Sequence, residues 1–198
     1  MNADLVLVDS GGSNIGSLQM AFARLGITCE LSRDASRIRS ARHVVLPGVG
    51  AAGPAMRRLQ ELNLVDTLRN LRQPVLGICL GMQLLFARSE EADVECLAII
   101  DANVRKMNSA PGIRVPHMGW NRLEAMRDHA MLSGIQPTSH AYFVHSYAAE
   151  CGAWTLARTH HGAAFSALVR QDNFHGAQFH PERSGQVGAT LLRNFVNL

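Results

Sequence analysis

The apolar positions in the N-terminal half of the chain follow two alternating spacings. Short continuous apolar runs are typical of buried strands, whereas apolar residues three or four positions apart are typical of helices that cover a sheet. The pattern predicts strands over 5–9, 27–31, 43–46 and 74–78, and helices over 14–25, 54–71 and 80–86. This alternation indicates an α/β fold with a central, mostly parallel sheet flanked by helices.

The pattern changes after residue 95. Apolar and polar residues alternate over 155–162 and 163–171, which predicts antiparallel hairpins in the C-terminal half. A further short strand is expected over 177–179 and a last helix over 187–196. A chain of 198 residues is long enough for one substantial core, so residues 1–198 are expected to form a single domain.

Composition and charge argue against several classes of function. The chain is 47% hydrophobic and 18% charged, and its net charge of +3 is spread over small basic groups without interleaved aromatic residues. This pattern gives little support for nucleic-acid binding. No apolar run is long enough to span a membrane and the N-terminus has no basic n-region, so a cytoplasmic protein is expected. The four cysteines form no C-x-x-C pair, so we expect reduced thiols, no metal site and no cofactor.

The segment "PVLGICLGMQLLF" (74–86) places Cys79 between two glycines at a strand-to-helix turn. This is the geometry of a nucleophile elbow, with cysteine in place of serine. Gly77 and Gly81 permit a tight turn, and the start of the following helix favours a thiolate. The alternative is that Cys79 is a small core residue, because free cysteine is among the residue types most often buried.

Two further segments supply what a nucleophilic thiol needs. In "GAQFHPERSG" (176–185), His180 can accept a proton and Glu182 can orient it, because Pro181 restricts the backbone between them. The alternative is a surface histidine and a glutamate that caps the last helix. The loop from Pro47 to Gly50 follows a strand and can offer N–H groups to an oxyanion, although such glycines also form plain turns. The thiol and both segments fall at the carboxyl ends of strands, where ligands bind in open α/β sheets.

The motifs G-x-C-x-G around Cys79 and H-P-E at 180–182 closely resemble those of the class I glutamine amidotransferases. The resemblance implies a flavodoxin-like fold and the hydrolysis of glutamine to glutamate and ammonia. It implies that Cys79 attacks the side-chain amide, that His180 transfers the proton and that Glu182 orients His180. The family pattern assigns the oxyanion hole to Gly48, Val49, Gly50 and the N–H of Leu80, and glutamine binding to Gln83, His145, Ser146 and Tyr147.

Other segments narrow the resemblance within the family. The stretches "VPHMGWN" (115–121) and "YFVHSY" (142–147) resemble the members that supply ammonia to a cyclase in histidine biosynthesis, and they argue against a cysteine peptidase. The implied partner is a cyclase of (βα)8-barrel type in a heterodimer. The implied interface includes His117, Trp120 and Asn121, although a run of this kind is also ordinary packing material.

Some positions depart from the family pattern and keep alternatives open. Ser10 stands where an aromatic residue is common, Arg183 stands where lysine is common, and "CLAIIDAN" (96–103) lacks the usual glycines. These departures leave open a paralogous amidotransferase that supplies ammonia for surface-sugar synthesis. A catalytically silent regulatory subunit on the same fold is a second alternative, and the intact triad argues against it.

Overall fold

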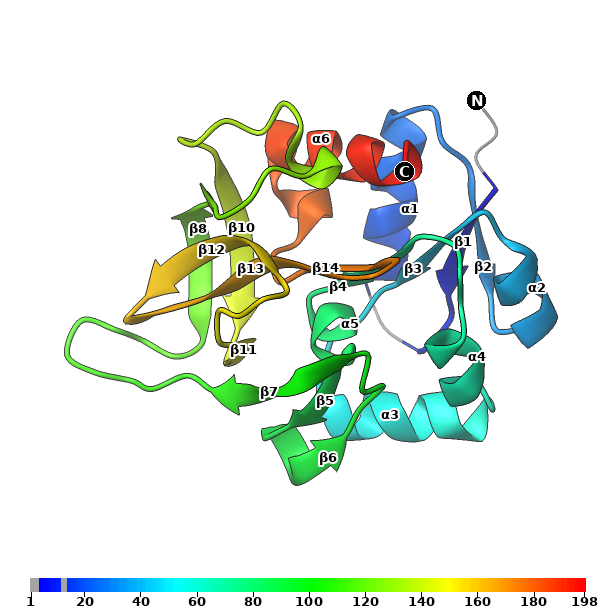
Figure 1. Ribbon diagram of the computed structural model, residues 1–198, viewed down its shortest axis with the longest axis horizontal. Helices are drawn as coiled ribbons and strands as arrows, with labels where there is room; N and C mark the ends of the chain where they lie inside the picture. Colours follow the sequence, from blue (N-terminus) through cyan, green and yellow to red (C-terminus); the bar gives the residue numbers. More distant parts are fainter. Residues whose placement is uncertain (1–3, 12–13) are drawn as a thin grey trace.

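A computed structural model describes residues 4–11 and 14–198, and Figure 1 labels its main elements. The first half of the chain contains β1 (Leu5–Val8), α1 (Ile15–Arg24), β2 (Cys29–Ser32), α2 (Ala35–Ser40), β3 (His43–Leu46), α3 (Ala52–Glu61), α4 (Val65–Arg69), β4 (Val75–Ile78) and α5 (Leu80–Gln83). The second half contains β5 (Phe86–Ser89), η1 (Glu91–Asp93), β6 (Val94–Glu95), β7 (Ile100–Lys106), β8 (His117–Arg122), β9 (Glu124–Ala125), η2 (Ala130–Leu132), β10 (His140–His145), β11 (Tyr147–Ala149), β12 (Thr155–His161), β13 (Ala163–Gln171), β14 (Phe174–Ala177), η3 (Pro181–Arg183) and α6 (Gly185–Val196).

The central sheet has eight strands in the order β2-β1-β3-β4-β14-β13-β12-β9. The five strands from β2 to β14 run parallel, and β13, β12 and β9 extend the sheet in antiparallel fashion. The α/β fold expected from the sequence is therefore confirmed, together with the antiparallel hairpin β12–β13 in the C-terminal half.

Helices cover both faces of the parallel part of the sheet. Leu5 and Leu7 of β1 pack with side chains of α1 and α6 on one face, whereas Val6 and Val8 pack with α2, α3 and α4 on the other. Figure 1 shows α1 and α6 above the sheet and α3 and α4 below it. Because both faces are covered, β1, β3 and β4 are short, fully buried and largely apolar runs, which is why the sequence pattern identified them.

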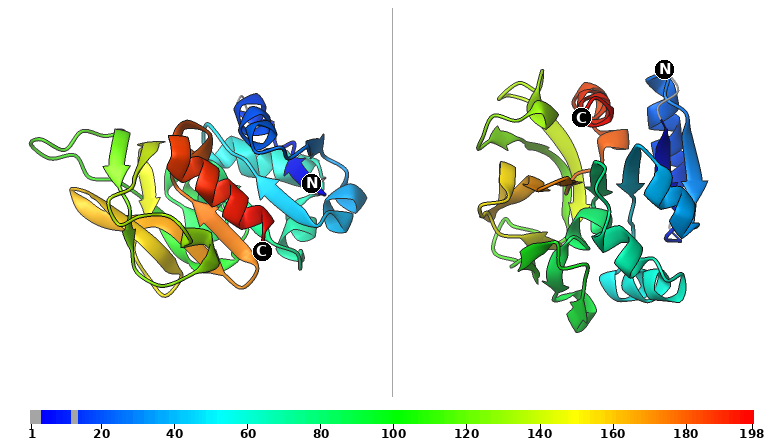
Figure 2. Two further views of the ribbon diagram at one scale, coloured as in Figure 1. Left: turned by 90° about the horizontal axis from the view of Figure 1, so that it is seen from above. Right: turned by 45° about the vertical axis from the view of Figure 1, so that its right-hand side comes forward.

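Two smaller sheets were not predicted. One has the strand order β11-β7-β5-β6, and the other is the antiparallel pair β8–β10. The ribbon views place β8, β10 and the β12–β13 hairpin at the end of the molecule opposite β2 (Figures 1 and 2). The pair β8–β10 matters for the site because β10 leads directly into the segment 145–147, to which the family resemblance assigns ligand binding.

The helix expected over 54–71 is in fact two helices, α3 and α4. Asn63 separates them with a φ of 54°, a left-handed conformation that asparagine adopts more readily than most residues and that ends a helix. The apolar spacing did not reveal the break because Leu59, Leu64 and Leu68 all pack in the same buried cluster. The prediction of one long helix was therefore wrong.

Other predicted boundaries are also corrected. The helix expected over 80–86 ends at Gln83, because Leu84 and Leu85 form a turn that leads into β5. The strand expected over 177–179 is β14, which ends at Ala177, where its pairing with β4 also ends. The helix α2 was not predicted, although Asp34 caps it by accepting hydrogen bonds from two backbone N–H groups.

The described residues contain neither a candidate membrane-spanning helix nor a candidate cluster of metal ligands. Within residues 4–11 and 14–198, no helix combines the length and apolar character that a membrane crossing requires. The same residues contain no group of three or more histidine, cysteine or acidic side chains placed to hold a metal ion. All four cysteines are free.

Candidate active site

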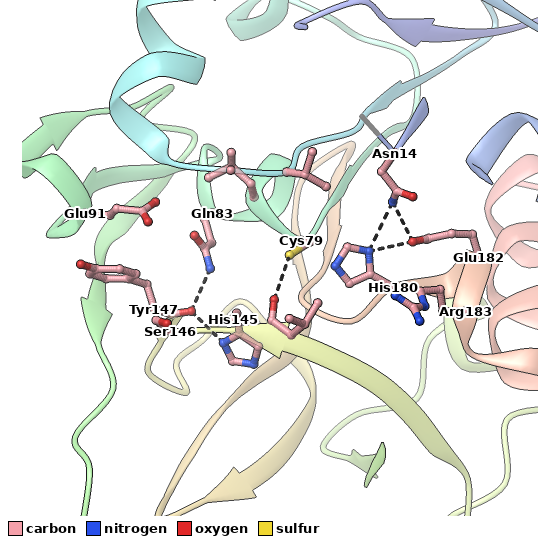
Figure 3. Close-up of a pocket in the computed structure, with 14 residues that line it drawn as sticks. Asn14, Cys79, Gln83, Glu91, His145, Ser146, Tyr147, His180, Glu182 and Arg183 are labelled. Carbon is pink, nitrogen blue, oxygen red and sulfur yellow. Dashed lines mark hydrogen bonds and ion pairs between the residues drawn. The ribbon is translucent and has the colours of Figure 1, made fainter. Parts of the chain in front are cut away.

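Four neighbouring parallel strands, β1, β3, β4 and β14, end at the same edge of the sheet. The segments that follow them contribute Asn14, Val49, Cys79 and His180, and all four residues line one cavity of about 370 Å³ (Figure 3). Ligands of open α/β folds bind at this edge of the sheet. The thiol, the glycine loop and the histidine therefore share one crevice.

Cys79 occupies a strained turn between β4 and α5. Its φ of 53° and ψ of −109° lie in a region that non-glycine residues rarely adopt. The backbone is held there by a hydrogen bond of 2.7 Å, which the N–H of Cys79 donates to the carbonyl of Ala177. Strain of this kind is characteristic of nucleophile elbows, because it projects the nucleophile from the end of the strand. The thiol is largely buried yet lines the cavity.

The glycines around Cys79 are required by close backbone packing. A Cβ atom on Gly81 would overlap the carbonyl oxygen of Leu46 at the end of β3, and one on Gly77 would lie 2.5 Å from the carbonyl oxygen of Gly81. A Cβ on Gly48 would lie 2.6 Å from the backbone nitrogen of Gly81. The loop after β3 therefore packs directly on the elbow, which only glycines at these positions allow.

His180 and Glu182 form a buried ion pair beside the thiol. Nδ1 of His180 lies 2.7 Å from Oε1 of Glu182, and the side chains are 6% and 0% exposed. The backbone N–H of His180 donates to the carbonyl of Tyr142 on β10, which fixes the start of η3. Glu182 does not cap the last helix, since Ser184 holds the N-cap position of α6.

The charges around His180 favour its protonated form. Burial alone disfavours the imidazolium, but hydrogen bonds to Cys79 and Glu182 outweigh it and raise the pKa of His180 to about 10. Burial also disfavours the carboxylate of Glu182, yet the hydrogen bond to His180 and the charge of that ring lower the pKa of Glu182. The site therefore stabilises an imidazolium of His180 against the carboxylate of Glu182.

Asn14 is a member of the site that sequence reasoning missed. Its Nδ2 donates to Oε1 of Glu182 at 2.7 Å and lies 3.4 Å from Nδ1 of His180 (Figure 3). Asn14 occupies the N-cap position of α1, but its side chain makes no capping hydrogen bond. An asparagine before a helix normally indicates a cap, so nothing in the local sequence distinguishes this residue from an ordinary cap.

Replacing Asn14 by aspartate is expected to lower kcat more than replacing it by alanine. The alanine variant loses one hydrogen bond to the Glu182 carboxylate, which predicts a kcat about tenfold lower than that of the native protein. The aspartate variant has the same shape but places a second anion against Glu182, which displaces that carboxylate from His180. Steady-state turnover and thermal unfolding of both variants measure this. An aspartate variant as active as the native protein contradicts a role for Asn14 in the triad.

The amide side chains of Gln83 and Gln178 are locked in one orientation. Nε2 of Gln83 donates to the carbonyl of Tyr147 at 2.8 Å and to Oε1 of Gln178 at 3.0 Å. Since a carbonyl only accepts, the nitrogen of Gln83 must face Tyr147, which leaves its Oε1 as the acceptor for a bound molecule. Nε2 of Gln178 then lies 3.8 Å from Sγ of Cys79. Sequence reasoning missed Gln178, whose position on a short apolar run resembles that of a core residue.

The expected oxyanion residues divide into two groups. Val49, Gly50 and Leu80 line the cavity, and the N–H of Leu80 belongs to the first turn of α5, where amides lack helical acceptors. Gly48 is absent from the lining of this cavity, because it faces the elbow backbone and a small space next to Ser10. Gly48 thus supports the loop, whereas the other three residues are exposed to a ligand.

The expected glutamine-binding residues all line the cavity opposite the thiol. His145, Ser146 and Tyr147 form the connection from β10 to β11, and Figure 3 shows His145 and Gln83 both directed at the carbonyl of Tyr147. Nδ1 of His145 lies 2.9 Å from that carbonyl oxygen. Gln83 comes from the helix that follows Cys79. The elbow and the segment 145–147 are therefore joined through hydrogen bonds.

The three expected interface residues lie in different environments. Trp120 is 58% exposed, whereas His117 is 4% exposed and packs inside the protein. Asn121 is half-buried and contacts His117. Of the three, Trp120 is the most exposed.

An elbow cysteine beside a buried histidine–glutamate pair, at the carboxyl edge of a parallel sheet, defines a thiol-dependent enzyme of the α/β class. Similarity to known families identifies which class of thiol-dependent enzyme this is. Residues 6–198 match the model of the glutamine amidotransferase class-I family, and the chain belongs to that family. It is therefore a glutamine amidotransferase with glutaminase activity.

Relatives cover nearly the whole chain. The protein named imidazole glycerol phosphate synthase subunit HisH from Xanthomonas axonopodis pv. citri (strain 306) is 53% identical over 195 residues, covering 98% of both chains. A protein of the same name from Xylella fastidiosa (strain 9a5c) is 49% identical over the same coverage. A solved structure agrees in fold: a crystal structure of a glutamine amidotransferase has a TM-score of 0.76 at 21% identity, covering 98% of this chain and 97% of that one.

Proposed function

We propose that Cys79, His180 and Glu182 are the catalytic triad of this amidotransferase, which acts as the glutaminase subunit of an imidazole glycerol phosphate synthase in histidine biosynthesis. The observation that carries the triad is the convergence of the strained elbow and the ion pair on one cavity. The identity of 53% over 98% of the chain to a synthase subunit supports a role in histidine biosynthesis and argues against a paralogue for surface-sugar synthesis. A silent subunit has no need of an intact ion pair beside its thiol.

The geometry supports a covalent mechanism in two halves. In the first, the Cys79 thiolate attacks the side-chain carbonyl carbon of glutamine, and the imidazolium of His180 donates its proton to the departing ammonia. In the second, neutral His180 takes a proton from water, which hydrolyses the glutamyl thioester and restores thiolate and imidazolium. Glu182 keeps the proton on Nδ1 and stabilises the positive charge of the ring.

The oxyanion that forms in each half requires N–H donors near Cys79. We assign this role to the N–H of Leu80 together with an N–H from the Val49–Gly50 segment, with Gly48 supporting the loop. Gly50 has a φ of +93°, and no atom lies within 4 Å of the place that a Cβ atom would occupy. The peptide unit between Val49 and Gly50 is therefore free to rotate at modest steric cost, which makes this donor adjustable.

The substrate glutamine is proposed to lie between the thiol and the segment 145–147. Oε1 of Gln83 accepts a hydrogen bond from it, and the backbone of His145, Ser146 and Tyr147 supplies the remaining polar contacts. The cavity of about 370 Å³ is large enough for one amino acid.

The partner is proposed to be a cyclase of (βα)8-barrel type that receives the ammonia and acts on a phosphorylated ribosyl-carboxamide. A strip formed by exposed Arg183, half-buried Tyr142 and exposed Trp120 leads from the cavity to β8. The guanidinium of Arg183, which lines the cavity, lies 4.6 Å from the ring centroid of Tyr142, and the ring of Trp120 contacts the same tyrosine. Exposed aromatic and arginine side chains are favoured at the centres of interfaces. Trp120 and Arg183 are therefore assigned to the docking surface.

Partner and acceptor together are expected to raise kcat for glutamine hydrolysis by at least about 10²-fold. If glutamine were hydrolysed whenever it bound, ammonia would be lost to solvent. A peptide at Val49–Gly50 that turns its N–H toward the oxyanion only in the complex prevents this, and one such donor is worth roughly 10²–10³ in kcat. Steady-state glutamate release by the chain alone, with the cyclase, and with cyclase plus acceptor nucleotide measures the effect. A chain that is fully active alone, or a partner that changes only KM, contradicts this mechanism.

A further inference from the structure

A continuous chain of hydrogen bonds runs from β8 to the segment 145–147. Nδ2 of Asn121 lies 3.2 Å from Nε2 of His117, and Nδ1 of His117 lies 3.1 Å from Nε2 of His145. Nδ1 of His145 lies 2.9 Å from the carbonyl oxygen of Tyr147, which also accepts from Gln83. The chain joins side chains of β8, β10 and α5, and His117 and His145 are almost completely buried.

The chemistry of its two ends fixes the direction of every bond in this chain. The carbonyl of Tyr147 only accepts, so His145 carries its proton on Nδ1 and accepts at Nε2. His117 must then donate from Nδ1 and accept at Nε2, which matches a donor on Asn121. The orientation of the Asn121 amide is set independently, because its Oδ1 accepts from the N–H of Arg122 and its Nδ2 also donates to the carbonyl of His160. All groups agree on one arrangement.

Both rings stay neutral, which this arrangement requires. Burial lowers the pKa of His117 to about 4 and that of His145 to about 3. A second proton on either ring would place two donors face to face. At neutral pH each ring therefore has one N–H and one acceptor, as the chain of hydrogen bonds demands.

We propose that Asn121, His117 and His145 are positioning residues, which hold the carbonyl of Tyr147, and through it the amide of Gln83, in the orientation that binds glutamine. This inference rests on the proposed function, which places glutamine against Gln83 and the segment 145–147. If the His117 N–H is lost, Nε2 of His145 is left buried without a donor. The ring of His145 then releases or rotates away from Tyr147, and Gln83 loses its fixed orientation.

Packing alone is the competing role for His117. Its ring stacks on those of Phe143 and His161, with centroids 5.0 Å and 4.2 Å away, and meets the ring of Phe165 edge to face. The two roles make opposite demands on a replacement. Phenylalanine keeps an aromatic ring and loses both hydrogen bonds, whereas asparagine loses the ring and keeps an N–H near the position of Nδ1.

The variants His117→Phe and His117→Asn test the proposal. In the complex with cyclase and acceptor, His117→Phe is expected to raise KM for glutamine at least about tenfold with kcat within about threefold, because an unsatisfied buried acceptor weakens binding by that order. His117→Asn is expected to raise KM only about threefold. The matched control is His161→Phe. It makes the same chemical change in the neighbouring ring, which does not belong to the chain of hydrogen bonds, and it is expected to leave KM unchanged. If His117→Asn is impaired more than His117→Phe, packing explains the residue and the proposal is overturned.

A second measurement uses the isolated chain and separates this proposal from the proposed function. Iodoacetamide alkylates the Cys79 thiol, and bound glutamine is expected to protect it. Without glutamine, the rate of Cys79 alkylation in His117→Phe should stay within about twofold of the native rate. The glutamine concentration that halves this rate should be at least about tenfold higher in His117→Phe than in the native protein. The half-buried Asn121→Ala provides a milder variant, with about threefold expected. Native protein that glutamine fails to protect overturns the proposed function and this inference with it, whereas equal protection of native protein and His117→Phe overturns the inference alone.

Discussion

Cys79→Ala is expected to reduce glutamine-dependent turnover by at least about 10⁴-fold. The thiol forms the covalent intermediate, and removing a nucleophile of this kind leaves only binding and oxyanion stabilisation. The ammonia-dependent reaction of the cyclase, assayed with added ammonium salt, should survive in the complex because its chemistry lies in the other chain. Glutamate release and cyclase product, measured with glutamine and with ammonium salt, give the two results separately.

Cys151→Ala is the matched control for this loss. Cys151 is an exposed free thiol outside the cavity lining, so its replacement should leave both reactions unchanged. A Cys79→Ala protein that keeps glutaminase activity within about tenfold of the native protein, a barrier change of only about 1.4 kcal/mol, contradicts the assignment of the nucleophile.

His180→Asn is expected to be the second most damaging change, with kcat reduced by about 10⁴-fold or more. The reduction of kcat in Glu182→Gln is expected to be at least about tenfold smaller. Losing His180 removes the group that moves the proton in both halves of the reaction. Losing the charge of Glu182 leaves the imidazole in place, because the backbone N–H of His180 still donates to the carbonyl of Tyr142 and the amide oxygen of the new glutamine still accepts from Nδ1. Steady-state kcat values of the two variants decide the order. If Glu182→Gln is the worse of the two, the proton is not transferred as described.

The sequence was sufficient to predict the parts of the fold whose physical cause is local. β1, β3 and β4 are short, fully buried and largely apolar runs, so they were recognised with nearly correct bounds. The elbow could be predicted because the glycines that it requires on both sides of Cys79 all lie within five consecutive residues, 77–81. Its strained φ of 53° and the overlap at Gly81 are the structural counterparts of that pattern.

Boundaries decided by tertiary packing could not be predicted. The break at Asn63 leaves the apolar spacing intact, since both helices pack on the same face of the sheet. The register of β14 is set by its pairing with β4 and β13, so the strand ends before the apolar Phe179, which remains fully buried. In each case a local pattern was compatible with two structures, and long-range contacts selected one.

Side-chain partners across the site were equally beyond local reasoning. Asn14 and Gln178 are each separated by long stretches of chain from the groups they contact, and their own neighbours in sequence suggest a helix cap and a core residue. His117 was expected near an interface, and nothing in the sequence indicated that its ring is buried in contact with His145. Hydrogen-bond direction, which orders this whole network, becomes visible only when donors and acceptors are placed together.

The measurement that tests the central claim most directly is site-specific labelling by an electrophilic glutamine analogue, such as a chloroketone with the glutamine backbone. The purified chain is treated with the analogue, with and without glutamine, and the modified residue is identified by peptide mass spectrometry. We predict one label per chain, located on Cys79, prevented by glutamine, and formed in parallel with the loss of glutaminase activity. Inactivation with Cys79 unmodified, or labelling of Cys29, Cys96 or Cys151 in its place, would contradict the account.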